Sequence, residues 1–376
     1  MSGKPLIGVV GLGAMGLGIA QVYTQAGFPV LATDAHAAVR ASAVSRLAAG
    51  LDARVAAGKL TPAARDATLA RLTLVETPQG MGTADLVIEA IAEHLAVKQA
   101  LFAALETVVS SKSVLATNTS SLSVTAMADG LSHPSRLLGL HFFNPAPAMK
   151  LVELVAHATT ATDALNLARS VTEAAGKTVI ACRDRPGFIV NRCARPFYGE
   201  ALALLEEGKS ASDIDAAMLA DGYRIGPLSL IDLIGADISL AATQGLADAM
   251  AGNARYHVFS ALKAQVATGN LGRKSGRGFL FPELPGASPS DAASISLRIE
   301  AMLANEAASL IAEGEIEEAA IDQAMRLGLN FPRGPFEAAR AHGLARIRAT
   351  LTALEAAAPG HLKGRYVVSP ALEALQ

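Results

Sequence analysis

A histidine and a glutamate on either side of a short turn are candidates for acid–base chemistry. His141 lies near the end of an apolar run, residues 137–143, and Glu153 lies within a second run, residues 150–155. The Asn-Pro-Ala-Pro segment between them predicts a turn joining two antiparallel strands, with His141 opposite Glu153. A carboxylate there would orient the imidazole and stabilise its charged form. The alternative is a buried histidine bonded to a main-chain carbonyl, but an unpaired carboxylate inside an apolar strand is costly.

A glycine-rich segment near the N-terminus has the pattern of a dinucleotide-binding loop. Gly11, Gly13 and Gly16 form a GxGxxG sequence between an apolar run, residues 6–10, and a predicted helix, residues 14–26. These glycines permit a tight turn, close approach of a pyrophosphate, and close packing of the helix on the strand. The helix N-terminus would then offer free N–H groups and a partial positive charge to the phosphates.

An aspartate indicates which nucleotide this loop binds. Asp34 follows the second predicted strand, residues 28–33, and its sequence neighbours Thr33, Ala35 and His36 include no arginine. A carboxylate there can accept hydrogen bonds from the adenosine ribose and would repel a 2′-phosphate. The sequence therefore predicts NAD rather than NADP. The alternative is a plain glycine turn followed by a surface aspartate.

The predicted base and the predicted cofactor suit the same reaction. Oxidation of a hydroxyl to a ketone by NAD needs a base, a group that orients this base, and donors around the substrate oxygen. Residues between 118 and 191 offer such a set around His141 and Glu153.

The elements that must position these residues alternate between strand and helix. This pattern predicts an α/β fold, with a Rossmann-like doubly wound sheet over residues 1–185. From Pro186 onward helical periodicity dominates, and the proline is expected in a helix's first turn. The expected strands are residues 6–10, 28–33, 73–75, 86–89 and 113–117, and the expected helices lie within 14–26, 37–71 and 95–109.

The helical second half contains two related segments. Glu200–Gly208, Asp213–Met218 and Gly226-Pro227 correspond in order to Glu306–Gly314, Ala320–Met325 and Gly334-Pro335. This pattern predicts duplication of one helical unit. The first copy is expected over residues 186–283, the second over 293–376, and the proline-rich segment 282–292 is expected to link them.

Several blocks of the chain resemble the signatures of the 3-hydroxyacyl-CoA dehydrogenase family. The resemblance covers about residues 5–281, and tandem C-terminal copies also occur among bacterial members that act on 3-hydroxyadipyl-CoA and 3-hydroxybutyryl-CoA. The blocks are Asn118-Thr119-Ser120-Ser121-Leu122, His141-Phe142-Phe143-Asn144-Pro145, Met149-Lys150-Leu151-Val152-Glu153 and Pro186-Gly187-Phe188-Ile189-Val190-Asn191-Arg192.

This resemblance implies specific roles in the reaction. His141 resembles the family's catalytic base and Glu153 its orienting partner, while Ser120 and Asn191 resemble the side chains that hold the substrate's 3-oxygen. The implied activity interconverts (3S)-3-hydroxyacyl-CoA and 3-ketoacyl-CoA with NAD, as in fatty acid metabolism. Without the resemblance, a helix N-cap is an alternative for Ser120, and a surface residue of a first helical turn is an alternative for Asn191.

The resemblance also implies contacts with the cofactor and with coenzyme A. Glu93, Lys98 and Asn118 match positions near the ribose and nicotinamide, and Lys274 matches a lysine that contacts NAD. Glu93 and Lys98 could equally form a solvated pair, and the segment around Lys274 a plain glycine turn. For coenzyme A, Lys59 or Arg54 could contact the phosphates, although a solvated role is an open alternative for both.

Single-copy members of the family dimerise through the C-terminal domain. This implies either a monomer in which the second copy packs on the first as an internal pseudo-dimer, or a homodimer. The second copy lacks a PGFIVNR block, so no second active site is expected.

Composition narrows the classes of partner and location. The net charge is −2 without a basic stripe, which argues against nucleic-acid binding. No long uncharged apolar run predicts a membrane span, and the start leads directly into a strand rather than a signal peptide. Cys182 and Cys193 could in principle pair, but small buried thiols are expected, and no metal-ligand spacing is present. The sequence therefore predicts a cytoplasmic enzyme without a metal.

Two other functions fit parts of the sequence. Enzymes of the 3-hydroxyisobutyrate and 6-phosphogluconate dehydrogenase type share the glycine loop and a helical C-terminal part, but they use a catalytic lysine where this chain has His-Phe-Phe-Asn-Pro. A non-catalytic, crystallin-like NAD-binding protein would be expected to lack one of Ser120, His141, Glu153 or Asn191, and all four are present.

Overall fold

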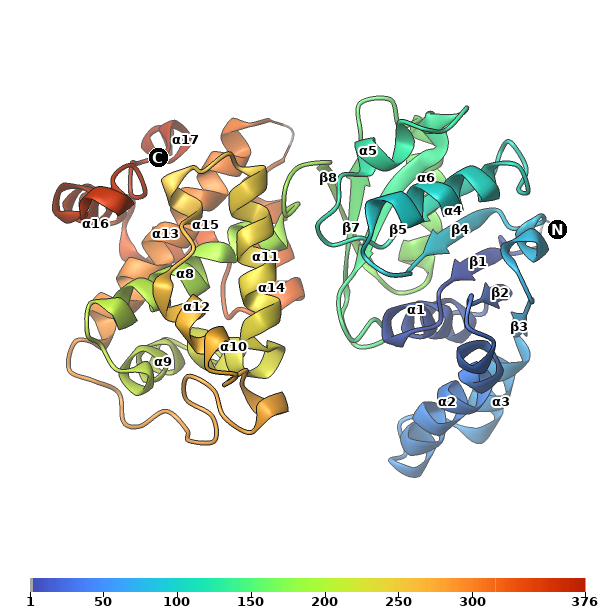
Figure 1. Cartoon of the computed structure of the whole chain (residues 1–376), viewed down its shortest axis with the longest axis horizontal. Coiled ribbons are helices and arrows are strands. Elements are labelled where there is room, and N and C mark those ends of the chain that lie inside the picture. The colour runs from blue at the N-terminus through green and yellow to red at the C-terminus, as the bar shows by residue number, and fades with distance from the viewer. Residues whose placement is uncertain (1–2, 315, 376) are drawn as a thin grey trace. The chain divides into compact units, whose positions relative to one another are not determined.

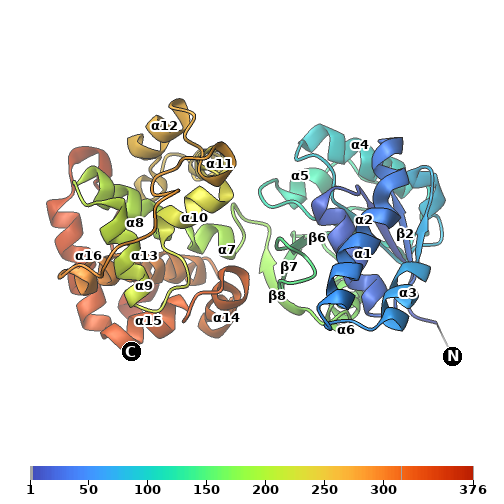
Figure 2. The ribbon, with the colours of Figure 1, turned by 90° about the horizontal axis from the view of Figure 1, so that it is seen from below.

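The computed structural model describes residues 3–314 and 316–375, which form two compact units (Figure 1, Figure 2). The first unit ends at Phe188 and the second begins at Ile189. Each unit has its own core and is described separately.

The first unit is built on one eight-stranded sheet with the order β3-β2-β1-β4-β5-β6-β7-β8. Neighbouring strands are parallel except β6 and β7, which are antiparallel. The strands are β1 (Ile7–Val10), β2 (Val30–Thr33), β3 (Leu72–Leu74), β4 (Leu86–Glu89), β5 (Val114–Thr117), β6 (Leu137–Phe142), β7 (Leu151–Ala156) and β8 (Thr178–Arg183).

Helices cover both faces of this sheet. Alternate side chains of one strand enter different cores: Ile7 and Val9 pack with residues of α1, α2 and α6, while Val10 packs with residues of α4 and α5. Burial on both faces explains why the central strands are continuous apolar runs. The helices are α1 (Ala14–Gln25), α2 (Ala37–Ala56), α3 (Pro62–Ala70), α4 (Leu95–Glu106), α5 (Val124–Ala128) and α6 (Thr162–Ala174), with short 3-10 turns at Pro78–Met81 and Pro134–Arg136.

The second unit is helical and is organised around one long helix. Residues 295–308 of α13 are all buried, and α8, α9, α15, α16 and α17 pack against this helix. The helices are α7 (Val190–Cys193), α8 (Arg195–Glu206), α9 (Ala211–Ala220), α10 (Pro227–Ile234), α11 (Ala236–Ala249), α12 (Ser260–Ala267), α13 (Ala292–Ala312), α14 (Glu318–Leu329), α15 (Pro335–His342), α16 (Leu344–Ala357) and α17 (Pro370–Ala374), with 3-10 turns at Ala254–Tyr256, Arg273–Ser275 and Gly360–Leu362.

The predicted α/β class with a parallel sheet and a helical C-terminal region is confirmed, but one predicted helix start is wrong. Residues 186–189 form a turn, and α7 begins only at Val190. The reason is the backbone at Gly187 (φ 75°) and Phe188 (φ 48°), both of which lie in the left-handed region and cannot continue a right-handed helix.

Two aspartates at corresponding positions of the helical unit have the same function. The Asp215 carboxylate accepts hydrogen bonds from the first N–H groups of α10, at 2.9 and 2.7 Å. The Asp322 carboxylate accepts the equivalent bonds at the start of α15, at 2.9 and 3.1 Å. An added Cβ at Gly226 or Gly334 would lie 2.2 Å from the respective aspartate side chain. Each aspartate therefore requires a glycine before the helix that it caps.

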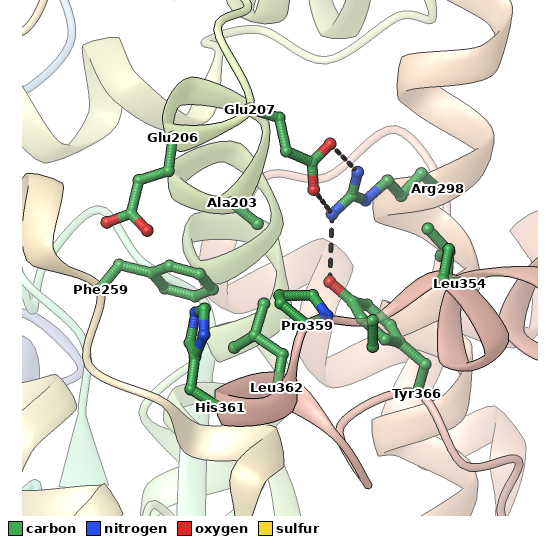
Figure 3. A pocket seen from close by; sticks show the side chains of 12 residues that line it. Ala203, Glu206, Glu207, Phe259, Arg298, Leu354, Pro359, His361, Leu362 and Tyr366 are labelled. Carbon is green, nitrogen blue, oxygen red and sulfur yellow. Dashed lines mark hydrogen bonds and ion pairs between the residues drawn. The ribbon is translucent and has the colours of Figure 1, made fainter.

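Two arginines at corresponding positions make reciprocal ion pairs. Arg192 bonds to Glu306 and Glu313, and Arg298 bonds to Glu200 and Glu207. Burial alone would lower the pKa of both arginines, but the carboxylates raise it above its ordinary value. Figure 3 shows Arg298 with Glu207 and Tyr366 at the edge of a pocket of about 410 Å³.

Within the described ranges, no single helix has the length and apolar character needed to cross a membrane. The pair α10 and α11 meets these requirements only when taken together, and it is bent by 103°.

Candidate active site

The antiparallel pair β6 and β7 brings His141 and Glu153 together. The two residues are register partners, and His141 Nδ1 lies 2.6 Å from Glu153 Oε2. His141 is 6% exposed and Glu153 is fully buried. A hydrogen bond from Nδ1 to the carboxylate directs the other ring nitrogen, Nε2, to act as the proton acceptor.

Neighbouring groups fix the position of this histidine. Its ring lies 4.6 Å from the ring of Phe143 and 5.8 Å from that of Phe188, measured between centroids. The Asn118 side-chain oxygen accepts a hydrogen bond from the N–H of Phe142, at 2.8 Å. Asn118, predicted to lie near the cofactor, therefore also ties the end of β5 to the strand that carries His141.

Glu93 organises the loop that contains Ser120. One of its carboxylate oxygens accepts bonds from the Thr119 hydroxyl at 2.5 Å, the Ser120 N–H at 3.1 Å and the Ser121 hydroxyl at 3.0 Å. Burial opposes ionisation, but the Thr119 hydroxyl and the Lys98 charge hold the pKa of Glu93 below its ordinary value. Glu93 is thus an anion at neutral pH that positions the Ser120 main chain.

Lys98 is enclosed rather than solvated. Its Nζ lies 2.5 Å from Glu89 and 3.2 Å from Glu93, and the Lys98 side chain is 1% exposed. Glu89, fully buried at the end of β4, also accepts a bond from the Thr117 hydroxyl. Glu89 was not among the predicted site residues. A glutamate at the end of a buried apolar strand does signal such a role, because a buried carboxylate needs a partner.

The glycine loop has the form that a dinucleotide requires. Gly11 has φ 96°, and an added Cβ would lie 2.5 Å from the Ala90 carbonyl oxygen. An added Cβ at Gly16 would lie 1.8 Å from the Gly11 carbonyl oxygen, whereas one at Gly13 would meet nothing within 4 Å. No side chain caps α1 at Gly13. The helix start is therefore open to a pyrophosphate, and the residues present fit NAD.

Asp34 lies at the end of β2 as predicted, but its surroundings were only partly foreseen. Its carboxylate accepts the N–H of Leu12 at 2.7 Å and of His36 at 2.8 Å, which connects it to the glycine loop. As predicted, no arginine is next to Asp34 in the sequence. In the fold, however, α2 brings Arg40 and Arg46 close to the segment of Leu12 and Asp34. Both arginines donate to main-chain oxygens, those of Asp34 and Leu12 respectively.

The remaining predicted residues lie elsewhere. Asn191 lies in α7 and Lys274 in the turn Arg273–Ser275, both in the second unit. Lys274 forms an ion pair with Asp237, at 2.5 Å, with both side chains about two-fifths exposed. Lys59 is exposed beyond the end of α2, and Arg54 donates to Gln25. The first unit thus places Ser120 after β5, the strand next to β6, and it pairs His141 of β6 with Glu153 of β7.

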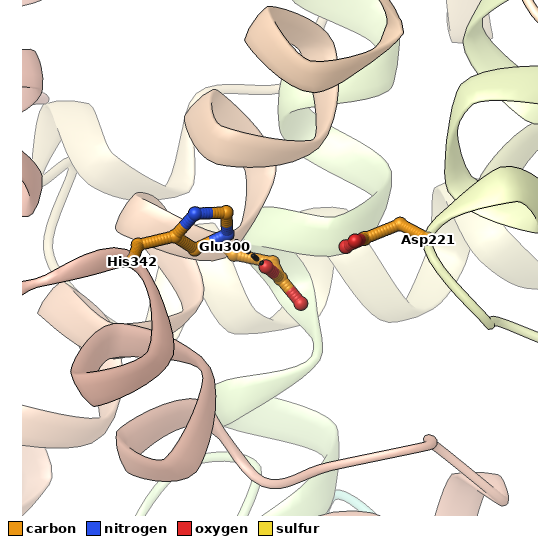
Figure 4. Close-up of side chains that lie close together, drawn as sticks. All are labelled: Asp221, Glu300 and His342. Carbon is orange, nitrogen blue, oxygen red and sulfur yellow. Dashed lines mark hydrogen bonds and ion pairs between the residues drawn. The ribbon is translucent and has the colours of Figure 1, made fainter.

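The second unit contains one group of side chains of the types that ligate metal ions, among the residues that the structure describes. Donor atoms of Asp221, Glu300 and His342 lie within 4.8 Å of one another (Figure 4). Arg333 already donates to both carboxylates, and His342 Nε2 lies 2.5 Å from Glu300. The arginine supplies the positive charge that a cation would bring, so this cluster is a closed ion network within the helical unit.

The fold and site define an NAD-dependent dehydrogenase. Parallel strands bring the glycine loop, Glu89, Asn118 and His141 to the carboxyl edge of one sheet, where such folds bind their cofactor. A model of the 3-hydroxyacyl-CoA dehydrogenase NAD binding domain matches residues 6–185, and one of the C-terminal domain matches residues 187–281 and 295–375. The chain belongs to the 3-hydroxyacyl-CoA dehydrogenase family.

Individual relatives agree with this assignment. The chain is 44% identical over 274 residues to 3-hydroxyadipyl-CoA dehydrogenase of Escherichia coli, which covers 72% of this chain and 58% of that protein. It is 40% identical over 280 residues to 3-hydroxybutyryl-CoA dehydrogenase of Mycobacterium tuberculosis, covering 73% and 96%. The chain thus spans less than two thirds of the first of these relatives and nearly all of the second.

Solved structures extend the similarity over the helical unit. The structure of 3-hydroxybutyryl-CoA dehydrogenase from Escherichia coli matches with a TM-score of 0.91 at 33% identity, covering 99% of this chain and 98% of the other. That of (S)-3-hydroxybutyryl-CoA dehydrogenase from Ralstonia eutropha matches with a TM-score of 0.71 at 36% identity, covering 73% and 98%.

Proposed function

We propose that this protein interconverts (3S)-3-hydroxyacyl-CoA and 3-ketoacyl-CoA, with His141 as the general base and Glu153 as its partner. The observation that carries the proposal is the 2.6 Å contact between His141 Nδ1 and a fully buried carboxylate. A carboxylate in such a site is stabilised by a charged partner, which His141 becomes when it accepts a proton. The pair is therefore suited to taking a proton from a substrate hydroxyl.

The residues act on the substrate in a defined order. Nε2 of His141 accepts the proton of the C3 hydroxyl, and the Glu153 carboxylate stabilises the imidazolium that forms. The glycine loop and Asp34 would hold NAD, which would supply the hydride acceptor for C3. Ser120 and Asn191 are proposed to donate hydrogen bonds to the substrate's 3-oxygen and so to fix its distance from the base. In the reverse direction His141 returns the proton to the ketone oxygen.

A single substitution tests the role of the histidine. In His141→Ala we expect NADH binding to be unchanged, because no cofactor residue is altered, and turnover of acetoacetyl-CoA to fall by at least about 10²-fold. Stopped-flow and fluorescence titration measure the two quantities independently. Near-normal turnover in this variant would remove His141 from the mechanism, and would leave the NAD-binding assignment untouched.

The acyl group and the coenzyme A contacts are further parts of the proposal. Relatives carry the names 3-hydroxyadipyl-CoA and 3-hydroxybutyryl-CoA dehydrogenase, so chains of about four to six carbons, with or without a terminal carboxylate, are the substrates to test. Exposed Lys59 is proposed to contact the nucleotide phosphates. A screen of 3-ketoacyl-CoA esters that varies chain length and terminal charge separates these substrates, and Lys59→Ala should raise KM for all of them equally.

We further propose that the helical unit is a duplication that forms an internal pseudo-dimer, and that the chain is a monomer in the cytoplasm. The reciprocal contacts of Arg192 and Arg298 support this, since a two-fold interface pairs residue i with j and j with i. The low cysteine content, two residues in the chain, fits a reducing compartment. Light scattering should give the mass of one chain, and a stable dimer would contradict the proposal.

A further inference from the structure

A buried lysine outside the proposed reacting groups holds the turn that joins His141 to Glu153. Lys177 lies between α6 and β8 and is 9% exposed. Its Nζ donates to the carbonyl oxygens of Ala146 and Met149, at 2.6 and 2.7 Å. Both carbonyls belong to the turn between β6 and β7. One side chain from a distant segment therefore fixes the geometry of this connection.

The ammonium group of Lys177 has no carboxylate partner among the described residues. Its two hydrogen bonds go to main-chain oxygens, and burial lowers its pKa to about 8. Removing an unpaired ammonium from water is costly, whereas an apolar side chain would fill the same space without that cost. Packing alone would therefore favour an apolar side chain at this position. The two hydrogen bonds to main-chain oxygens give the reason for a lysine here.

The same turn lies directly against the helix that follows the glycine loop. An added Cβ at Gly18 of α1 would lie 3.3 Å from Ala146 Cβ and 3.3 Å from Pro147 Cδ. Ala146 is 2% exposed and belongs to the core that α1 shares with the sheet. The turn is therefore in contact with α1 on one side and is bonded to Lys177 on the other.

We propose that Lys177 is a positioning residue that holds the β6–β7 turn against α1 and thereby sets the affinity for the nicotinamide cofactor. A loosened turn would let α1 shift relative to β6, which changes the cofactor's fit at the carboxyl edge of the sheet. The inference rests on the proposed dehydrogenase activity only for its steady-state readout, because NADH binding is measured directly.

Three substitutions at this position test the inference in the full-length protein. Lys177→Met keeps the length of the side chain but removes both bonds, Lys177→Gln keeps a neutral donor, and Lys177→Arg keeps the charge and two donors. Loss of charge-assisted hydrogen bonds of this kind predicts an increase of about tenfold in the Kd for NADH with methionine. Glutamine should give a smaller increase, and arginine should restore most of the affinity.

Steady-state kinetics separate positioning from simple destabilisation. We expect KM for NAD to rise about tenfold in Lys177→Met while KM for the acyl-CoA stays within about twofold. A variant that is merely less stable would lose active enzyme and leave both KM values unchanged. Lys112→Met, at an exposed lysine of the same unit, is the matched control and should change neither constant.

Gly18→Ala tests the contact with α1 independently of the lysine. The added methyl group would press on Ala146 and Pro147, and we expect a severalfold rise in the Kd for NADH. If Lys177→Met does not fold, the remaining variants still test the inference. The Kd for NADH should then rise from wild type to Lys177→Arg to Lys177→Gln, and it should also rise in Gly18→Ala. Equal NADH affinity across these variants overturns the inference. Normal turnover in His141→Ala together with weak NADH binding in the Lys177 variants would overturn the proposed function alone.

Discussion

Replacing Glu153 by glutamine removes one charge from the centre of the proposed site and almost no volume. Glu153 is fully buried, and its carboxylate lies 2.6 Å from His141 Nδ1. The amide oxygen of glutamine can still accept a hydrogen bond from Nδ1, so the ring keeps its tautomer and its orientation. What the variant loses is the negative charge that stabilises the imidazolium formed during the reaction.

The size of the effect follows from the strength of this contact. A hydrogen bond to a charged group contributes about 1.5–3 kcal/mol, roughly twice the value for a neutral pair. The part that depends on charge is then about 0.75–1.5 kcal/mol, because the neutral bond remains. If this energy is realised only when the imidazole is protonated in the transition state, kcat falls about four- to twelvefold and the KM values stay nearly constant.

The assay is steady-state reduction of acetoacetyl-CoA by NADH, with NADH titration as the control for folding and cofactor binding. Glu173→Gln is the matched control, since Glu173 is an exposed carboxylate of the same unit in an i,i+4 pair with Arg169. Such a pair contributes only about 0.3–0.5 kcal/mol to stability and should not affect kcat. A kcat for Glu153→Gln within threefold of wild type would refute the assigned role of the carboxylate.

Three other results are expected. Gly16→Ala should abolish NADH binding because its Cβ would lie 1.8 Å from the Gly11 carbonyl oxygen. The control Gly50→Ala has open space around it and should bind NADH normally, so equal affinities in NADH titrations would contradict the loop assignment. Arg298→Met should lower the free energy of unfolding by about 1.5–3 kcal/mol, because buried Glu200 loses one charged hydrogen-bond partner but keeps Arg365. Exposed Arg326→Met should lower it by less than about 1 kcal/mol, and denaturant melts measure both values. Cys182 should react slowly with iodoacetamide at pH 8, because burial and the charge of Glu153 raise the pKa of its thiol. In Glu153→Gln the thiol of Cys182 should react faster, and a slower reaction would argue against the charge of Glu153.

Sequence reasoning succeeded where one local signal determined the structure. The predicted strand 86–89 is β4 with the same limits. A short apolar run between polar segments matches a strand that is buried on both faces of a parallel sheet. The register of His141 and Glu153 followed from the length of one turn, and the structure places the two residues opposite each other. Such features need no knowledge of distant segments.

Features that depend on contacts between distant segments were not predictable. Arg40 and Arg46 reach the cofactor loop only because α2 packs beside it, and nothing near Asp34 in the sequence signals them. Lys177 likewise reads as a surface lysine between two elements until its two carbonyl partners are known. The helix predicted from Pro186 failed because the left-handed backbone at Phe188, a non-glycine residue, has no sequence signal.

The proposed duplication separates residues that maintain the fold from residues that perform chemistry. Arg192 and Arg298 correspond, and both make the reciprocal buried ion pairs. The residue before each arginine differs: it is Asn191, proposed to bind the substrate oxygen, in one segment, and buried Leu297 in the other. In the proposed pseudo-two-fold arrangement the interface would constrain both arginines, whereas one active site would constrain only one of the preceding positions. An arginine present in both segments, next to an asparagine present in only one, is what the proposal of one catalytic copy and one supporting copy predicts.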